Sequence, residues 1–262
     1  MKIITLLTDF GWMDGYPGIM KGVILSITHQ VQIVDITHDI PPQNIMAGTL
    51  AAGRAYSYFP GGTIHIIVVD PGVGTSRRSI AAQIGDQYFI CPDNGLITIP
   101  LQNAEKHHQA STIINLNNPQ FWLPNPSMSF HGRDIFAPVA AHLATGVPLS
   151  MMGEVINDPV LLKIPAPIRI DNIWCGQIIH IDHFGNLTTN FTKEEINTNN
   201  IQIQIGSHII NGISQTFGSN PPGSLIAIWD SSDHLSICIV NGNANDILSI
   251  GLDDSLTIIE IK

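Results

Sequence analysis

The sequence predicts an α/β protein with two domains, and two observations lead to this class. Short apolar runs typical of strands alternate with helix-like segments through the first half of the chain, the pattern of a mainly parallel sheet covered by helices. Beyond a proline-rich stretch, Pro159–Pro167, only short strand-like runs follow. We therefore expect a Rossmann-like α/β domain over residues 1–165 and an all-β domain, either a small barrel or a sandwich, over residues 170–262.

The individual elements follow from apolar runs and their periodicity. The expected strands of the first domain are Ile3–Leu7, Gln32–Ile36 and Thr63–Val69, followed by a hairpin-like pair, Ser79–Gln83 and Tyr88–Cys91. Its expected helices are Ile19–Ile27, Ile45–Tyr58 and Ile135–Leu143. The expected strands of the second domain are Trp174–Asp182, Ile201–Ile205, Leu225–Trp229, Leu235–Val240 and Leu256–Ile261, with no helix among them.

Composition narrows the class of partner. The net charge is −10, with 11 Lys and Arg against 21 Asp and Glu, and no basic cluster that would suit a nucleic acid. No apolar run approaches the length of a membrane span, so we expect no membrane partner. The 3 cysteines form no C-x-x-C pattern, which argues against a disulfide framework or a zinc ribbon. These features predict a cytoplasmic protein that binds a small molecule.

The loop after Thr63–Val69 carries the strongest chemical signal. Asp70 follows the expected strand directly, and Pro71, Gly72 and Gly74 then force a tight loop that leads to Arg77. The carboxyl ends of parallel strands meet at the edge of the sheet where ligands bind, so this acid and arginine are placed for chemistry. The alternative is an Asp that caps its own turn and an Arg on the solvated surface.

Three further loops offer polar groups. Asp9 follows the first strand and could accept hydrogen bonds from two neighbouring hydroxyls, or it could cap the next helix. His131 could be a general base, a charge partner or merely structural. In the second domain Asp182, Phe184 and Asn186 could hold an ammonium group and stack on a ring, or form an ordinary hairpin loop.

Metal and phosphate sites are poorly supported. The 11 histidines include no H-E-x-x-H or H-x-H spacing. The segment Gly72-Val73-Gly74 lacks both the third glycine and the Lys-Ser/Thr pair of a phosphate loop. We therefore predict no metal site.

Five motifs occur along the chain in a fixed order. They are Thr8-Asp9-Phe10-Gly11 with Met20-Lys21-Gly22, Val68-Val69-Asp70-Pro71-Gly72-Val73-Gly74, Pro92-Asp93-Asn94-Gly95-Leu96, Phe130-His131-Gly132-Arg133-Asp134-Ile135-Phe136-Ala137-Pro138, and Asp182-His183-Phe184-Gly185-Asn186 with Thr189-Asn190. Together they resemble the S-adenosylmethionine hydroxide adenosyltransferase family, whose relatives include fluorinating and chlorinating enzymes.

The resemblance implies an α/β domain followed by a β-barrel, in a homotrimer whose sites lie between one subunit's first domain and its neighbour's second. It also implies a reaction in which water or hydroxide attacks the ribose C5′ of S-adenosylmethionine and releases adenosine and L-methionine, with no cofactor. The catalytic residues that it implies are Asp70, Arg77 and His131, with Arg78 as an alternative for the arginine.

The same resemblance implies a set of substrate-binding residues. Asp9 would hold the ribose hydroxyls, which Ser129 and Gly132 would flank. Asp182 and Asn186 would hold the methionine part beside Phe184. The remaining members of the set are Phe217 and Asn241 near the adenine, together with Phe130 and Val240.

Differences from the halogenating relatives favour water as the nucleophile. Those enzymes place Tyr and Thr where this chain has Asp70 and Val73, and they carry a long insertion after the arginine region. The chain also has Gln43 where they have an aromatic residue, and Pro17 where we expect a small aliphatic one. A halogenase that uses chloride and a non-catalytic protein that binds adenosine or S-adenosylmethionine remain the alternatives.

Overall fold

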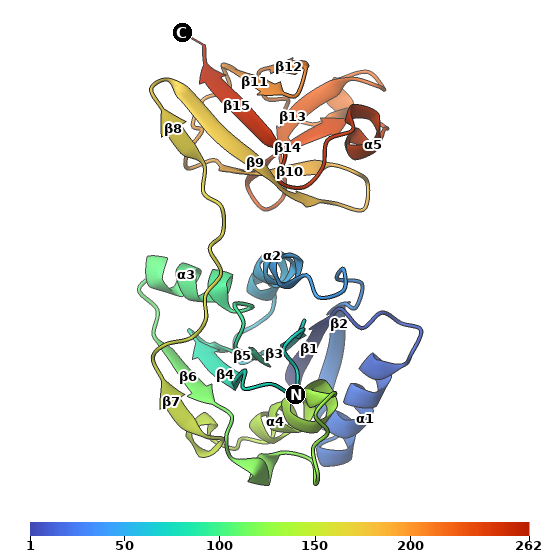
Figure 1. Cartoon of the computed structure of the whole chain (residues 1–262), viewed down its shortest axis with the longest axis vertical. Helices are drawn as coiled ribbons and strands as arrows, with labels where there is room; N and C mark the ends of the chain where they lie inside the picture. The colour runs from blue at the N-terminus through green and yellow to red at the C-terminus, as the bar shows by residue number, and fades with distance from the viewer. Residues whose placement is uncertain (262) are drawn as a thin grey trace. The chain divides into compact units, whose positions relative to one another are not determined.

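A computed structural model describes residues 1–261 of the chain. The chain divides into two compact units, Met1–Leu162 and the residues from Lys163 onward, and each has its own sheet (Figure 1). The division falls inside the proline-rich stretch Pro159–Pro167. The predicted α/β class is confirmed, with helices in the first unit and an antiparallel sheet in the second.

The first unit is built on a mixed sheet of seven strands, in the order β2-β1-β3-β5-β4-β6-β7. The strands β1, β2, β3 and β5 are parallel, whereas β4, β6 and β7 add antiparallel pairings at one side. Their bounds are β1 Lys2–Thr8, β2 Val31–Thr37, β3 Ile64–Val68, β4 Ser79–Ile84, β5 Gln87–Pro92, β6 Ser111–Asn115 and β7 Glu154–Ile156. The parallel part therefore brings the carboxyl ends of β1 and β3 side by side.

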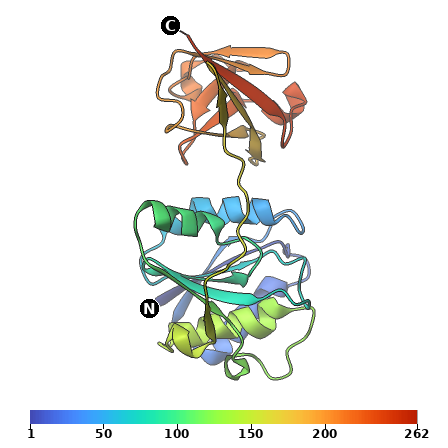
Figure 2. The ribbon, with the colours of Figure 1, turned by 60° about the vertical axis from the view of Figure 1, so that its left-hand side comes forward.

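Helices cover both faces of this sheet, as Figures 1 and 2 show. They are α1 (Tyr16–Ile27) and α4 (Ala137–Ala144) on one face, with α2 (Ile45–Ala55) and α3 (Thr98–Lys106) on the other. Because side chains alternate along a strand, Ile4 and Leu6 pack toward α1 and α4 while Leu7 belongs to the opposite core. Among the described residues, no helix has both the length and the apolar character needed to cross a membrane.

The sequence did not predict α3, β6 or β7. The helix α3 is short and contains Pro100, which would break the middle of a helix but is tolerated in its first turn. Only Ile113 and Ile114 of β6 are buried, so the strand lacks a clear apolar pattern. The helix predicted over Ile45–Tyr58 ends at Ala55 and continues as a single 3₁₀ turn.

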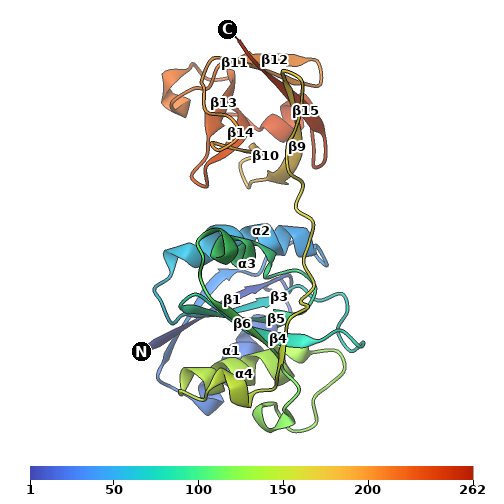
Figure 3. The same cartoon turned by 90° about the vertical axis from the view of Figure 1, so that its left-hand side faces the viewer.

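The second unit is an antiparallel, nearly closed barrel (Figure 3). Its strands run in the order β12-β11-β15-β9-β10-β14-β13, and β12 and β13, at the two ends of that order, also contact each other. The bounds are β8 Ile168–Ile170, β9 Ile173–Ile181, β10 Leu187–Thr192, β11 Ile201–Ile205, β12 His208–Asn211, β13 Leu225–Trp229, β14 His234–Ile239 and β15 Ser255–Glu260, with β8 paired to β9 alone. Of the two architectures expected, this is the barrel.

The prediction that the second domain contains no helix was wrong. A short helix, α5 (Ala244–Leu248), follows β14. The side chain of Asn243 caps it by accepting a hydrogen bond from the backbone N–H of Asp246. A helix of this length spans little more than one turn, so it leaves no periodic pattern in the sequence.

The buried side chain of His65 makes stability depend on pH. Its Nδ1 lies 2.8 Å from Thr5 Oγ1 and its Nε2 lies 3.1 Å from Gln87 Oε1, and burial lowers its pKa from 6.5 to about 4. Below pH 6.5 the unfolded chain binds a proton at this position that the folded chain refuses. We expect His65 to remove up to about 3 kcal/mol of stability as the pH falls from 6.5 to 4.

Urea unfolding of wild type and His65→Gln across this pH range measures the effect. The variant is expected to be less stable at pH 7 but to lose less stability on acidification. Its free energy of unfolding should fall with pH less steeply than that of wild type, by at most the slope that one bound proton contributes. Equal slopes for the two proteins would show that His65 takes up its proton as readily when folded as when unfolded.

Candidate active site

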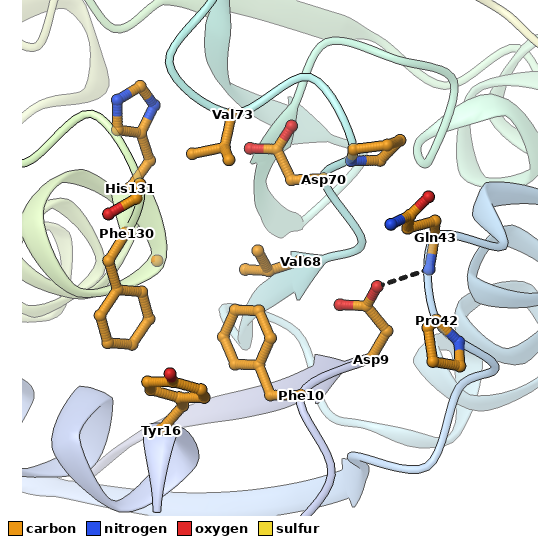
Figure 4. Close-up of a pocket in the computed structure, with 13 residues that line it drawn as sticks. Asp9, Phe10, Tyr16, Pro42, Gln43, Val68, Asp70, Val73, Phe130 and His131 are labelled. Atoms are coloured by element: carbon orange, nitrogen blue, oxygen red, sulfur yellow. Dashed lines mark hydrogen bonds between the residues drawn. The ribbon is translucent and has the colours of Figure 1, made fainter. Parts of the chain in front are cut away.

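Four loops of the first unit meet around a pocket of about 410 Å³ (Figure 4). One loop follows β1 and carries Asp9; a second joins β2 to α2 and carries Gln43; a third follows β3 and carries Asp70; a fourth contains His131 and leads into α4. The pocket is lined by Asp9, Phe10, Tyr16, Pro42, Gln43, Val68, Asp70, Pro71, Val73, Ser129, Phe130, His131 and Gly132. The structure thus gathers the first-unit residues predicted to bind substrate, Asp9, Ser129, Phe130 and Gly132, in one cavity with Asp70 and His131.

Asp9 is held by backbone contacts on both sides. Its N–H donates to the carbonyl of Val68 at 3.3 Å, which ties the β1 loop to the end of β3. Its Oδ2 accepts the backbone N–H of Gln43 at 2.8 Å, the contact drawn in Figure 4. Gln43 has a left-handed backbone with φ of 64°. Because the contact uses the main chain of Gln43, the Gln-for-aromatic difference at this position leaves it intact.

Asp70, Arg77 and His131 form a contiguous cluster. Arg77 donates from Nε to Asp70 Oδ1 at 3.0 Å and from Nη2 to Asp70 Oδ2, and Nη2 also lies 3.1 Å from His131 Nδ1. Its Nη1 donates to the carbonyl of Arg78 at 3.0 Å and to Ser79 Oγ at 2.9 Å. A guanidinium has five N–H donors, and these five acceptors use all of them. Arg77 therefore has no hydrogen left for a ligand and acts by holding its neighbours.

The cluster is desolvated, which changes its acid–base properties. The side chains of Arg77 and Asp70 are 9% and 5% exposed. Burial raises the pKa of the Asp70 carboxyl, and the charge and hydrogen bonds of Arg77 offset part of that rise. Burial lowers the pKa of His131, and the positive charge of Arg77 lowers it further.

The neighbouring Arg78 belongs to a different set of contacts. It donates from Nε to Asp93 Oδ2 at 2.8 Å and from Nη1 to Asp158 Oδ1 at 2.8 Å. Asp93 in turn accepts the backbone N–H of Val160 at 2.8 Å. Of the two candidate arginines, Arg77 is the one that touches Asp70 and His131.

A π-helical turn places His131 and the aromatic wall of the pocket. The turn covers Gly132–Phe136 and leads directly into α4. A Cβ on Gly132 would lie 3.2 Å from the Phe130 ring and 3.3 Å from Met20 Sδ, so a larger residue would force these neighbours to shift by a few tenths of an ångström. The rings of Phe10, Tyr16 and Phe130 meet edge to face, with centroids 5.1–5.9 Å apart (Figure 4).

The second unit has a separate pocket of about 450 Å³ that gathers other predicted residues. It is lined by Phe184, Asn186, Phe217, Ile239, Asn241, Gly242 and Asn243. Asp182 lies next to this group: its Oδ2 accepts Asn186 Nδ2 at 2.8 Å, and its Oδ1 accepts the backbone N–H groups of Phe184 and Asn186. Phe184 is 73% exposed and Phe217 40%.

Val240, which the resemblance places among the substrate-binding residues, has a buried side chain. Its side chain is 4% exposed and packs with Ile226, Ile228 and Cys238. Its backbone N–H donates to the carbonyl of Ser224 at 3.0 Å, and its own carbonyl accepts Gly223 N–H at 2.8 Å. The side chain therefore lies in a small apolar cluster that is separate from the core of the barrel.

Several lining residues escaped prediction. Phe10 and Val73 stand inside the quoted motifs, and Tyr16 is close to one, so proximity to a motif was an available signal. Pro42 offers none, because only the register of the β2–α2 loop against β1 brings it to the pocket. Among the described residues no group of three or more His, Cys, Asp or Glu is arranged to hold a metal ion.

Comparison with known proteins decides the family. A model of the SAM hydroxide adenosyltransferase N-terminal domain matches residues 4–153, and a model of the C-terminal domain of the same family matches residues 176–257. The chain belongs to this family.

Relatives match over nearly the whole chain. The (R)-S-adenosyl-L-methionine hydrolase of Salinispora arenicola is 32% identical over 258 residues, which cover 97% of both chains. A fluorinase from Actinoplanes is 28% identical over 221 residues, 74% of this chain and 73% of its own. The crystal structure of an uncharacterized conserved protein from Thermotoga maritima superposes with a TM-score of 0.89 at 35% identity, covering 98% of this chain and all of that one.

Proposed function

We propose that this family member hydrolyses S-adenosylmethionine to adenosine and L-methionine by attack of water on the ribose C5′. The observation that carries the proposal is the buried Asp70 carboxylate, held on both oxygens by Arg77, in the wall of a pocket that also contains Asp9. The relatives named as hydrolases, which align over 97% of the chain, support it. The fluorinases align over a smaller part.

The reaction requires the protein to act mainly on the water molecule. A C5′–O bond forms while the C5′–S bond breaks, and its electron pair stays on sulfur as the neutral thioether of methionine. The leaving group therefore needs no acid, and the sulfonium is already activated, so we expect no cofactor. What remains is to orient a water molecule and accept its proton.

We assign Asp70 as the group that accepts the proton of the attacking water. An Arg N–H can only donate, so Nδ1 of His131 must accept from Arg77, and its lone pair is occupied. The hydrogen of the neutral ring then lies on Nε2, which makes His131 a hydrogen-bond donor that orients water. Arg77 and the backbone N–H of Gly72 engage three of the four lone pairs of the Asp70 carboxylate, so one is left for water, and its raised pKa makes Asp70 a stronger base than an ordinary aspartate.

Asp9 is our candidate for binding the ribose. Its carboxylate offers two acceptor oxygens for the neighbouring 2′ and 3′ hydroxyls, and Gln43 fixes its orientation. Ser129, Phe130 and Gly132 line the same cavity. We assign Asp182 and Asn186 to the methionine part, beside Phe184, and Phe217 and Asn241 to the adenine.

We also propose that the protein is a cytoplasmic homotrimer in which the second unit of a neighbouring subunit completes each site. Exposed aromatic side chains on the second unit support an intersubunit role. Phe184 and Phe217 line a pocket yet are 73% and 40% exposed, which is costly for large apolar groups left in water.

Halide is the less favoured nucleophile. A buried carboxylate in the pocket wall repels an anion, and Val73 offers no hydroxyl to replace the water shell of chloride. The same carboxylate is what a neutral water molecule requires. The identity of Asp70 therefore favours hydrolysis over halogenation.

Incubation with S-adenosylmethionine in ¹⁸O-labelled water tests the function. Mass spectrometry is expected to find adenosine with one ¹⁸O in its 5′ hydroxyl and unlabelled methionine. No adenosine above an enzyme-free control would contradict the proposal, and tight adenosine binding without turnover would favour a binding protein. Formation of 5′-chloro-5′-deoxyadenosine at high chloride would favour the halogenase.

A further inference from the structure

A chain of buried and half-buried hydrogen bonds lies behind the loop that carries Asp9. Thr8 Oγ1 lies 2.8 Å from His38 Nδ1, His38 Nε2 lies 3.0 Å from Asp35 Oδ1, and Lys21 Nζ lies 2.5 Å from Asp35 Oδ2. Thr8 and His38 have no exposed surface. These four residues come from the end of β1, from α1, and from β2 with the residue just after it. The mechanism proposed above uses none of them.

The hydrogens of this chain can be assigned in one direction. The Lys21 ammonium only donates, so Asp35 accepts from it, and Asp35 also accepts from His38 Nε2–H. Burial raises the pKa of Asp35, but the hydrogen bonds from Lys21 and His38 outweigh it and the net shift is downward, which keeps Asp35 anionic. With the ring hydrogen of His38 on Nε2, its Nδ1 accepts the hydroxyl hydrogen of Thr8.

The chain ends on the backbone next to Asp9. With its hydrogen given to His38, Thr8 Oγ1 accepts the N–H of Phe10 at 3.2 Å. The backbone carbonyl of His38 makes a second tie, because it accepts the N–H of Gly11 at 2.8 Å. Both residues that follow Asp9 are therefore bound to the same network.

Trp12 covers the network from outside. Its ring meets the His38 ring edge to face with centroids 4.7 Å apart, and Lys21 Nζ lies 5.8 Å from the Trp12 centroid. The loop from Asp9 to Trp12 is thus fixed through its backbone and through one side chain. Holding the loop in this way removes polar side chains of the network from water, which is unusual for a loop that only connects two elements.

A nucleophilic role for Thr8 does not fit. The order Thr8, His38, Asp35 has the residue types of a Thr-His-Asp triad, but Thr8 is fully buried and does not line the pocket. A substrate atom cannot reach its hydroxyl. The network acts on the substrate only through the loop that it holds.

We propose that Thr8, His38 and Asp35 are positioning residues that aim the Asp9 carboxylate at both hydroxyls of a ribose. Selectivity for a nucleoside with a vicinal diol then depends on this network. The inference rests on the proposed function, because that assigns Asp9 to the ribose. It extends the site to residues that touch no substrate.

The chain provides a matched control on the same strand. Thr5 and Thr8 both lie on β1, both are fully buried, and each hydroxyl lies 2.8 Å from a histidine Nδ1. Only Thr8 also accepts a hydrogen bond from the site loop. Valine has nearly the shape of threonine, so Thr8→Val and Thr5→Val each remove one buried hydroxyl.

Calorimetric titration with adenosine and with 2′,3′-dideoxyadenosine measures the effect. Thr8→Val is expected to bind adenosine about tenfold more weakly and dideoxyadenosine within about twofold of wild type, since hydrogen bonds to a charged group are worth roughly this much. Thr5→Val is expected to lose thermal stability while keeping both affinities. Thr8→Ser, which keeps the hydroxyl, is expected to keep the wild-type ratio.

The outcomes separate this inference from the function. Equal losses of adenosine affinity in Thr8→Val and Thr5→Val would overturn the positioning role and leave hydrolysis standing. Wild-type protein that prefers adenosine but never turns over S-adenosylmethionine would overturn hydrolysis, while a selective Thr8→Val effect would still support the network. Wild-type protein with no preference for the diol would overturn the inference outright.

Discussion

Asp70→Asn is expected to lower kcat for hydrolysis of S-adenosylmethionine by about a thousandfold, within the range of general-base catalysis. The amide cannot take the proton of water, and its NH₂ group faces an Arg77 N–H that now lacks an acceptor. Because Asp70 acts on water, KM is expected to change by no more than about threefold. Steady-state formation of adenosine, followed by liquid chromatography, measures both constants.

Asp158→Asn is the matched control for this substitution. It removes a carboxylate that also accepts from an arginine, at 2.8 Å from Arg78 Nη1, but the Asp158 side chain is 80% exposed and lies outside the pocket. Its kcat is expected to equal that of wild type. An Asp70→Asn enzyme that keeps more than a tenth of wild-type kcat would show that another group accepts the proton.

Arg77→Gln is expected to lower kcat by about a hundredfold and to move the acid limb of the pH–rate profile to higher pH. The positive charge of Arg77 lowers the pKa of both Asp70 and His131, so its loss raises both. Asp70 then stays protonated, and inactive as a base, up to a higher pH. A purely structural role for Arg77 would lower activity without moving the profile.

Arg78→Gln is the corresponding control, with the opposite pattern. Its kcat and pH profile are expected to match wild type, because its contacts are with Asp93 and Asp158. The side chain of Asp93 is 2% exposed, so its charge would be left buried without an opposite charge, at a cost of about 3 kcal/mol in the free energy of unfolding. Loss of activity in Arg78→Gln with normal stability would show that catalysis depends on Arg78 and not on Arg77.

Local sequence predicted the elements that have a strong apolar pattern. The strands β1 and β3 were found because most of their residues are apolar, as is typical of a strand that is buried on both faces. The helix α3 and the strand β6 were missed because a proline and polar residues hide their patterns. In the second unit α5 is too short to show a period.

The same contrast applies to the site. Asp9 and Asp70 could be predicted because each follows a buried strand, and parallel neighbours bring such positions together. The burial of the Val240 side chain could not, because it depends on contacts with Ile226 and Ile228, which lie on β13. Nor could the supporting contacts, because Thr8 and His38 are far apart in the sequence.

The sequence by itself therefore determined the class of the fold, the motifs and the family that they resemble, since these depend on local pattern and residue identity. Only the tertiary structure decided that Arg77 rather than Arg78 contacts Asp70 and His131, that its five N–H groups are all used, and that Thr8 and His38 support the Asp9 loop. The physical reason is that adjacent side chains point in different directions, and a hydrogen bond forms only when the folded backbone brings its two atoms within about 3 Å.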